Sequence, residues 1–316
     1  MITVENLKKS YGGKEVLHGL SFHVPDGQVT GFLGPNGSGK SSTLRCILGL
    51  DRPDDGTVLF DGEPTTGEAI AKNRSSVVGA LLEPTWYLPS HSAKTHAYAI
   101  ARAAGLSTER ADECLAMVGL TEVASKKIKT FSLGMKQRLG LAIALMGNPK
   151  HLLLDEPVNG LDPEGVHWMR GLIRQCAAQG RAVLVSSHLL HEMELTADRV
   201  VLIGRGSLLG EHTLSEFLSS AGSAGTTVRL RVQEQQQLMD AISQRADLNI
   251  RALPDGAAEI SGQLPPQELA HTVGTLARDN GWVVTELTPS RAGLEQRYLD
   301  VTQNAVEYRA GKAGAA

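Results

Sequence analysis

Long apolar runs are missing from this sequence of 316 residues. No stretch approaches the roughly 20 consecutive apolar residues that a transmembrane helix needs. The N-terminal residues also lack the apolar segment of a secretory signal peptide. We therefore expect a cytoplasmic protein, and any membrane process that it serves must take its membrane part from another polypeptide.

Cysteine and net charge are scarce as well. The three cysteines, Cys46, Cys114 and Cys176, are widely spaced and follow no metal-ligand pattern, so we interpret them as buried or half-buried thiols in a reducing compartment. The formal net charge of −3 does not favour nucleic-acid binding. A composition of 41% hydrophobic and 21% charged residues argues against disorder. This length is sufficient for one large core and a second, smaller one.

The pattern of strand-like and helix-like segments predicts an α/β core for residues 1 to about 218. Short apolar runs bounded by turn residues suit parallel strands that are buried on both faces. Ile2–Leu7 and Glu15–Val24 read as strands, and we expect them to be antiparallel. Between Ser92 and Asn148 the pattern is nearly all helix. An α/β core with a helical insertion follows.

The order of elements changes beyond residue 218. Residues 219–225 are small and indicate a flexible linker. The segments over 226–310 then follow the order β-α-β-β-α-β, with a hairpin around Pro254–Gly256, which is the ferredoxin-like order. This region shows no metal-ligand spacing and no Gly-rich loop. We interpret it as an accessory dimerisation or regulatory domain, with ligand sensing as the alternative.

A glycine-rich segment fits the pattern G-x-x-x-x-G-K-[ST] without a mismatch, after an expected strand and before an expected helix. Glycines let such a loop wrap round phosphates with its N–H groups inward, and the next helix directs its N-terminus at the same charge. We expect Lys40 to reach the β- and γ-phosphates and Ser41 to bind Mg²⁺, with Ser42 close by. The predicted nucleotide contacts are Gly34, Pro35, Asn36, Gly37, Ser38, Gly39, Lys40 and Ser41.

Two acids, Asp155 and Glu156, end an apolar strand-like run. Acids at the tip of a buried strand emerge at the carboxyl edge of the sheet, where ligands bind in open α/β sheets. Asp155 then faces the metal and fits a Walker B role. Glu156 can polarise a water in line with the γ-phosphate, which makes it the candidate catalytic base. Together with the phosphate loop, this pair predicts Mg²⁺-dependent ATP hydrolysis.

Over residues 1–218 the chain resembles an ABC-transporter ATPase subunit, because five further motifs follow in the family's order. Tyr11 matches the aromatic residue that stacks on adenine. Glu83 stands where the family usually has the glutamine of its Q-loop, and it keeps an oxygen that can approach Mg²⁺ or the attacking water. Asp162 lies in a segment that looks like the D-loop. His188, in Ser-Ser-His, looks like the switch histidine that contacts the γ-phosphate.

The fifth motif is a degenerate form of the family signature LSGGQ. The segment Phe131–Met135 has Leu133 in place of the first glycine and Met135 in place of the glutamine. Ser132 and Gly134 remain. In the family the serine hydroxyl and nearby backbone N–H groups contact the γ-phosphate across a dimer, so the resemblance assigns nucleotide contacts to these two residues.

The resemblance implies a P-loop NTPase fold of the ABC ATPase type: an α/β core with an antiparallel β subdomain and a helical subdomain over about 84–147, plus the small α+β ferredoxin-like domain. It makes residues 1–218 the nucleotide-binding domain, with ATP and Mg²⁺ as ligands. It also implies a homodimer that clamps ATP between the phosphate loop of one chain and Ser132 and Gly134 of the other. The remaining partner would be a separately encoded transmembrane permease, at the inner face of the cell membrane.

Two details favour export. Glu83 and the segment Gly293–Leu299 resemble features of exporter ATPases of the bacitracin- and daunorubicin-resistance type, so we expect the cargo to be a drug, an antibiotic or an antimicrobial peptide. The alternative is a soluble ABC ATPase that acts on the ribosome or on nucleic acid. Such proteins usually carry two cores or a long coiled-coil insertion, and this chain has neither, so no nucleic-acid partner is expected. A third possibility is a module that binds ATP but no longer hydrolyses it, and the presence of Glu156 and His188 argues against it.

Overall fold

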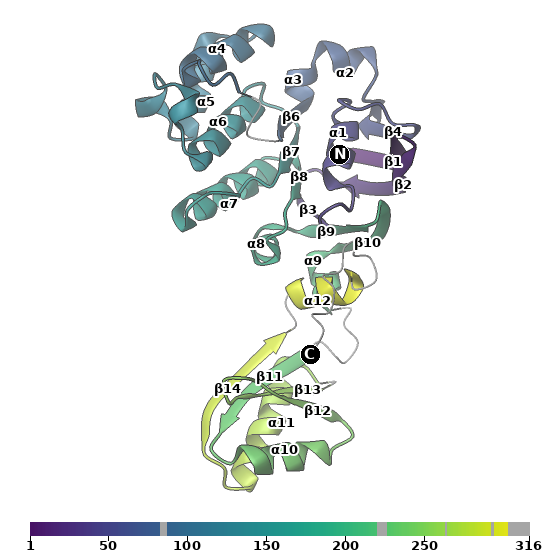
Figure 1. Cartoon of the computed structure of the whole chain (residues 1–316), viewed down its shortest axis with the longest axis vertical. Coiled ribbons are helices and arrows are strands. Elements are labelled where there is room, and N and C mark those ends of the chain that lie inside the picture. Colours follow the sequence, from purple (N-terminus) through teal and green to yellow (C-terminus); the bar gives the residue numbers. More distant parts are fainter. Residues whose placement is uncertain (83–86, 220–225, 263, 292–293, 303–316) are drawn as a thin grey trace, which may run out of the picture. The chain divides into compact units, whose positions relative to one another are not determined.

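The computed structural model describes residues 1–82, 87–219, 226–262, 264–291 and 294–302 (Figure 1). The chain divides into two compact units, whose bodies are Met1–Thr213 and Leu214–Val301. The second unit therefore begins with α9 (Leu214–Ser219), before the linker that the sequence predicts. Residues 220–225 of that linker lie outside the described residues, and the predicted domain boundaries stay predictions.

The first unit is organised by a largely parallel sheet in the order β10-β9-β3-β8-β7-β6 (Figure 1). Neighbouring strands run parallel from β9 to β6, and β10 pairs antiparallel with β9. Every residue of β3 and β8 is buried, as expected for central strands covered on both faces. The strands are β3 (Val29–Leu33), β6 (Val78–Leu81), β7 (His151–Asp155), β8 (Ala182–Ser186), β9 (Arg199–Gly204) and β10 (Ser207–Thr213).

A second sheet, in the order β2-β1-β4-β5, packs on the first. The antiparallel pairing predicted for the first two strands is confirmed. Phe22 of β2 and Phe32 of β3 stack with ring centroids 5.2 Å apart, so the two sheets share one apolar core. This packing fixes the position of β3, the strand that leads into the phosphate loop. The strands are β1 (Ile2–Tyr11), β2 (Lys14–Val24), β4 (Asp55–Phe60) and β5 (Glu63–Pro64).

The predicted helical region contains α4 (Ala93–Ala103), α5 (Thr108–Met117) and α6 (Leu133–Leu145), which pack together on the left of the unit in Figure 1. Each begins after a serine whose hydroxyl accepts a hydrogen bond from the first turn, which is the usual N-cap interaction. Among the described residues, no helix combines the length and the apolar character that crossing a membrane requires.

The helix expected after the phosphate loop is confirmed as α1 (Lys40–Ile47). The other helices of this unit were not assigned from the sequence, and the longest of them, α7 (Pro163–Ala178), packs against β3 and β8. Asp162 is the N-cap of α7 and Pro163 is its first residue, a combination that favours a helix start. The short helices are α2 (Glu68–Lys72), α3 (Arg74–Val77) and α8 (Leu190–Thr196).

All three cysteines are buried free thiols, as the sequence predicted. Cys46 lies on α1, Cys114 on α5 and Cys176 on α7. Burial is the main reason that the pKa of each thiol is raised, and for Cys46 it is raised to about 11. These thiols are therefore protonated at neutral pH and behave as small apolar side chains.

The second unit contains an antiparallel sheet in the order β12-β13-β11-β14, with α10 and α11 on one face (Figure 1). Its core is formed between that face and the two helices by side chains such as Val228, Leu230, Ile260 and Val273. The elements are β11 (Thr226–Val232), α10 (Gln235–Ser243), β12 (Leu248–Ala252), β13 (Ala258–Gly262), α11 (Pro266–Asp279), β14 (Val284–Arg291) and α12 (Leu294–Thr302).

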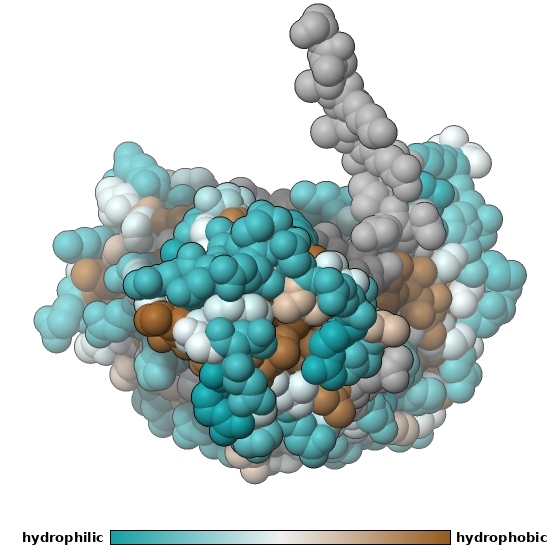
Figure 2. Space-filling view, turned by 90° about the horizontal axis from the view of Figure 1, so that it is seen from below, coloured by the Kyte–Doolittle hydropathy of each residue, from teal (hydrophilic) through white to brown (hydrophobic). Residues whose placement is uncertain are grey.

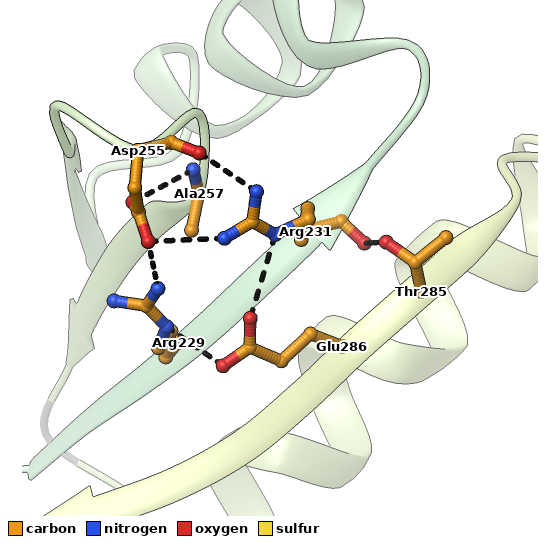
Figure 3. A network of polar contacts seen from close by, with 6 residues as sticks. All are labelled: Arg229, Arg231, Asp255, Ala257, Thr285 and Glu286. Carbon is orange, nitrogen blue, oxygen red and sulfur yellow. Dashed lines mark hydrogen bonds and ion pairs between the residues drawn. The ribbon is translucent and has the colours of Figure 1, made fainter.

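The other face of this sheet carries an ion-pair network, drawn in Figure 3. Arg229 and Arg231 are two residues apart on β11 and therefore point to the same side. Glu286 of β14 accepts from Arg229 Nε over 2.7 Å, and Asp255 of the hairpin accepts from both arginines. The side chains are each about a third to a half exposed, so the network stabilises the sheet only modestly.

The surface of the molecule seen from below in Figure 2 is mostly hydrophilic, with a smaller number of hydrophobic residues between the polar ones. In the second unit the large apolar side chains that are exposed are Val283, Val284, Leu287 and Val301. Scattered apolar residues of this kind are normal on a soluble surface and indicate no site by themselves.

Candidate functional site

The phosphate loop connects the buried strand β3 to α1. Gly37 has φ +80° and Gly39, the N-cap of α1, has φ +103°, both in the region that favours glycine. A Cβ atom at Gly34 would lie 2.6 Å from the carbonyl oxygen of Ile203, and one at Gly39 would lie 2.7 Å from Leu17 Cδ2. The loop conformation therefore requires glycine where the sequence has it.

Lys40 and Ser38 turn their polar atoms into this loop. Lys40 is 9% exposed, and its Nζ donates to the carbonyl oxygens of Gly34, over 2.5 Å, and of Pro35. Burial lowers the pKa of the Lys40 ammonium, and the nearby Glu156 and Asp155 carboxylates oppose that shift. The buried hydroxyl of Ser38 has no hydrogen-bond partner among the described residues. A phosphate oxygen fits both groups, since buried donors require partners.

Asp155 lies opposite the phosphate loop at the carboxyl end of β7. Its Oδ2 lies 3.3 Å from Ser41 Oγ, and its Oδ1 accepts a hydrogen bond from Ser186 Oγ. Ser186 is fully buried at the end of β8, in direct register with Asp155. Two hydroxyl groups from two neighbouring elements thus fix the orientation of this carboxylate.

Glu156 adopts an unusual backbone conformation, with φ +50°. The other non-glycine residues with positive φ among those described are Asn, Asp or the turn residue Arg205. For a glutamate this conformation costs roughly 1–2 kcal/mol. Its N–H donates to the carbonyl oxygen and to Oγ of Ser186, over 3.1 and 3.2 Å. Backbone strain of this kind is typical of functional sites.

The carboxylate of Glu156 is paired with His188. Oε2 lies 2.8 Å from His188 Nδ1 and 3.4 Å from the His188 N–H. An ionised carboxylate can only accept, so Nδ1 carries the proton that the histidine donates. The predicted base and the predicted switch histidine therefore lie side by side.

The phosphate loop and the two acids that follow β7 line one cleft of about 320 Å³. It offers a buried ammonium, a helix N-terminus and loop N–H groups to an anion, and two carboxylates at the opposite wall. This donor set can bind a polyphosphate and orient a water for attack on it. The lining residues are Val16, Asn36, Gly37, Gly39, Lys40, Ser41, Ser42, Asp155 and Glu156.

Tyr11, the predicted adenine contact, lies at the end of β1 and is 42% exposed. Its hydroxyl donates to Asp51 Oδ2 over 2.6 Å, and Lys9 Nζ lies 5.2 Å from the ring centroid. Asp51 also accepts from Arg45 Nε and Nη2, over 2.8 and 2.9 Å. The pKa of Asp51 is lowered to about 2, mainly by the hydrogen bonds from Arg45 and next by the one from Tyr11. This role of Asp51 as a support for Tyr11 was not predicted from the sequence.

Replacing Asp51 by Asn is expected to raise the KM for ATP by about three- to tenfold, because weakening one charged hydrogen bond loosens Tyr11 by roughly 1 kcal/mol. kcat should not change, since Tyr11 is not among the residues that line the cleft with Asp155 and Glu156. Steady-state kinetics check this result, and Tyr11→Phe, which removes the same hydrogen bond, should behave alike. A changed kcat would contradict it.

Because the pKa of folded Asp51 is lowered, the hydrogen bond that supports Tyr11 is present above about pH 4 and is lost as the pH falls toward 2.

The two surviving signature residues lie at the start of α6 and do not line the described part of the cleft. Ser132 is its exposed N-cap, and its hydroxyl accepts from Met135 N–H over 3.2 Å. Gly134 lies against the loop before α7, where an added Cβ would be 3.1 Å from Leu161 Cδ2. Leu133 packs on Gly160 of the same loop, which has φ +73°. The leucine in the signature is therefore accommodated by a neighbouring glycine.

Of the two remaining predicted site residues, Asp162 is described by the structure. It caps α7, with Oδ1 accepting a hydrogen bond from Gly165 N–H over 3.0 Å, so its carboxylate stabilises the start of that helix. Glu83 lies outside the described residues. Ser186 was missed from the sequence, although its position at the end of the strand next to β7 was a usable signal, because the carboxyl ends of neighbouring parallel strands share one edge.

Comparisons with known proteins match this chain to ATP-binding proteins of ABC transporters. The family model described as ABC transporter matches residues 17–159. The lantibiotic transport ATP-binding protein SrtF of Streptococcus pyogenes is 36% identical over 211 residues, covering 67% of this chain and 90% of SrtF. The bacitracin transport ATP-binding protein BcrA of Bacillus licheniformis is 32% identical over 306 residues, covering 95% of this chain and 96% of BcrA.

A solved structure shares the fold of the first unit. It is the dimeric post-hydrolysis state of the ATP-binding cassette MJ0796 bound to ADP and Pi, with a TM-score of 0.62 and 26% identity. The match covers 68% of this chain and 99% of that chain. The predicted α/β cassette fold is thereby confirmed for the part of the chain that contains the cleft.

Proposed function

This chain belongs to the ABC transporter family as its ATP-binding and ATP-hydrolysing subunit, and we propose that it powers a separately encoded membrane permease that exports an antibiotic or an antimicrobial peptide. The observation that carries this proposal is the cleft lined by Lys40, Ser41, Asp155 and Glu156, with His188 hydrogen-bonded to Glu156. We place the subunit at the cytoplasmic face of the membrane, where ATP is available.

Magnesium fits the site. Ser41 Oγ and Asp155 Oδ2 are 3.3 Å apart and face the same cleft, and such hard oxygen atoms are the ligands that Mg²⁺ prefers, with several waters retained. We infer that these two residues hold the ion, with Glu83 as a further candidate ligand. Bound there, the ion would neutralise charge on the β- and γ-phosphates.

The remaining steps follow from this chain's own residues. Lys40 and the loop N–H groups bind the phosphates, and Tyr11 stacks on the adenine. Glu156 orients the attacking water and accepts its proton, and His188, beside Glu156, contacts the γ-phosphate. Catalysis is thus mainly positioning and charge stabilisation, as expected for phosphoryl transfer.

We propose that two chains form the ATP clamp. The N-terminus of α6 is exposed at Ser132, and N–H groups at a helix N-terminus attract anions. In a head-to-tail dimer, Ser132 and Gly134 of one chain would contact the γ-phosphate bound by the other. The dimeric cassette found among the solved structures supports this arrangement.

A groove of about 560 Å³ in the first unit is our candidate for the permease contact. It lies between α4 and the segment from α2 to β6, and its lining includes Leu82, which directly precedes Glu83 in the sequence. Ile100 and Leu50 on its rim are 36% and 50% exposed. Its apolar lining suits a short amphipathic helix of a membrane protein. The lining residues are Leu48, Leu50, Ala71, Lys72, Arg74, Ser75, Val78, Ala80, Leu82, Ile100, Ala103 and Ala104.

Replacing Ile100 by Glu is expected to reduce co-purification with the permease encoded beside this gene by about tenfold or more, because a charge would be buried in an apolar contact. ATP hydrolysis by the isolated subunit should stay unchanged. Met117→Glu is the matched control, since Met117 is 46% exposed on α5 and lies outside the groove. Equal recovery of the permease with both variants would contradict this docking surface.

The nature of the cargo rests on relatives. SrtF and BcrA are named for lantibiotic and bacitracin transport, and the match to BcrA extends over nearly the whole of both chains, including the second unit. Testing the permease complex for export of a lantibiotic and of bacitracin from membrane vesicles examines this proposal directly. Uptake in the opposite direction would reject it.

For the second unit we infer a ferredoxin-like fold, over about residues 226–310, that serves dimerisation or regulation. The element order β-α-β-β-α-β and the strand order β12-β13-β11-β14 support this assignment. The face of the sheet opposite α10 and α11 carries arginines and carboxylates in balanced number, as the network of Figure 3 shows. This balance of charge does not suit a strongly charged ligand.

A further inference from the structure

The helix that carries the signature serine also reaches the catalytic glutamate of its own chain. Gln137 lies five residues after Ser132 on α6 and is only 2% exposed. Its Nε2 donates to the main-chain oxygen of Glu156 over 3.3 Å. Gln137 Oε1 has no hydrogen-bond partner within the described part of the chain, so this one contact connects the amide to its surroundings. Buried amides are costly unless they are hydrogen-bonded, which makes the contact specific.

The backbone at Glu156 depends on contacts of this kind. Its left-handed conformation is held at the N–H by Ser186 and at the carbonyl oxygen by Gln137 and by the Asn159 N–H, over 3.2 Å. These hydrogen bonds fix both peptide groups of Glu156 and therefore the direction in which its carboxylate leaves the chain. A displaced peptide would move the base away from the attacking water.

α6 holds the same loop at a second place. Leu133 packs closely on Gly160, where an added Cβ would lie only 2.3 Å from Leu133 Cδ2. Gly134 approaches the same residue, since an added Cβ at Gly134 would lie 3.4 Å from the Gly160 carbonyl oxygen. The loop from Glu156 to Gly160 is thus attached to α6 at its beginning by a hydrogen bond and at its end by packing. A shift of α6 must change the loop that contains the base.

We propose that Gln137 is a positioning residue that couples the two ATP sites of the dimer. The inference rests on the proposed function, in which Ser132 of one chain contacts the ATP held by its partner. Closure on the partner's ATP fixes α6, and Gln137 transmits that position to Glu156 of its own chain. Each site then reaches the hydrolytic geometry only when the other site is filled. Gln137 itself contacts neither the nucleotide nor the water.

The test replaces Gln137 by Met in the full chain, which keeps length and buried volume but removes the donor. We expect kcat to fall about tenfold, because a misplaced base is inefficient even after a small shift. ATP affinity measured by direct binding should stay within about twofold, and the Hill coefficient for ATP should fall from roughly 2 toward 1. Gln137→Asn, which is one methylene too short to reach Glu156, should give the same result if the Met variant folds poorly.

Leu139→Ala is the matched control, because Leu139 is fully buried on the same helix but makes no contact with Glu156 among those described. A kcat for Gln137→Met within about twofold of the unaltered chain, or an equal fall in Hill coefficient for Leu139→Ala, overturns the proposal. Ser132→Ala separates the two possible failures. If it remains fully active, the dimeric clamp is rejected, whereas an inactive Ser132→Ala beside an unaffected Gln137→Met rejects Gln137 alone.

Discussion

Replacing Glu156 by Gln is expected to lower ATP turnover by at least about 100-fold, since general-base assistance contributes at least that factor. The amide keeps the shape of the side chain and an oxygen for the hydrogen bond with His188, so the change isolates the loss of the basic charge. ATP binding should persist, and ATP-bound dimers should accumulate because the nucleotide is not cleaved. Phosphate release and gel filtration with ATP measure the two effects.

The control for this prediction is Glu113→Gln, which makes the same chemical change on the exposed side of α5, remote from the cleft. It should hydrolyse ATP at the normal rate and form no stable dimer. Near-normal turnover in Glu156→Gln would remove Glu156 from the role of base, and the reaction would then need another group to orient the water.

Replacing Lys40 by Ala should weaken ATP binding by about 10- to 100-fold, because hydrogen bonds to charged groups contribute roughly 1.5–3 kcal/mol. Lys40 is nearly buried and donates to two loop carbonyls, so its ammonium already points into the loop that receives the phosphates. Removing it leaves the phosphate charge without its closest partner. Isothermal titration with ATP measures the affinity.

Lys150→Ala serves as the comparison for Lys40, since it deletes the same charge from an exposed position at the start of β7. Its ATP affinity should match that of the unaltered chain. Unchanged affinity in Lys40→Ala would mean that the loop does not hold the phosphates, and the assignment of the cleft would have to be abandoned.

The parts of the site that could be predicted are those in which local sequence dictates geometry. Gly34 and Gly39 were predicted from the spacing G-x-x-x-x-G-K-[ST] alone, and the acids of β7 come out at the edge where a buried parallel strand must end. Patterns of this kind are readable because the constraint lies within a few consecutive residues.

Supports that come from distant segments could not be predicted in the same way. Ser186, Gln137 and Asp51 act on Asp155, Glu156 and Tyr11 respectively, and each pair is separated by at least 19 residues. Such partners depend on strand register, helix packing and the turn after α1, which one sequence does not specify. The missed strand β4 has a similar cause, since it pairs with β1 across many intervening residues.

The three buried cysteines have a practical consequence. Because burial raises the pKa of each native thiol, alkylating reagents at neutral pH should leave them unmodified while the protein stays folded. A single cysteine introduced on the surface could then carry a spin label or a fluorophore without removal of the three native cysteines. Opening and closing of paired subunits could thus be followed as a distance between two probes during turnover.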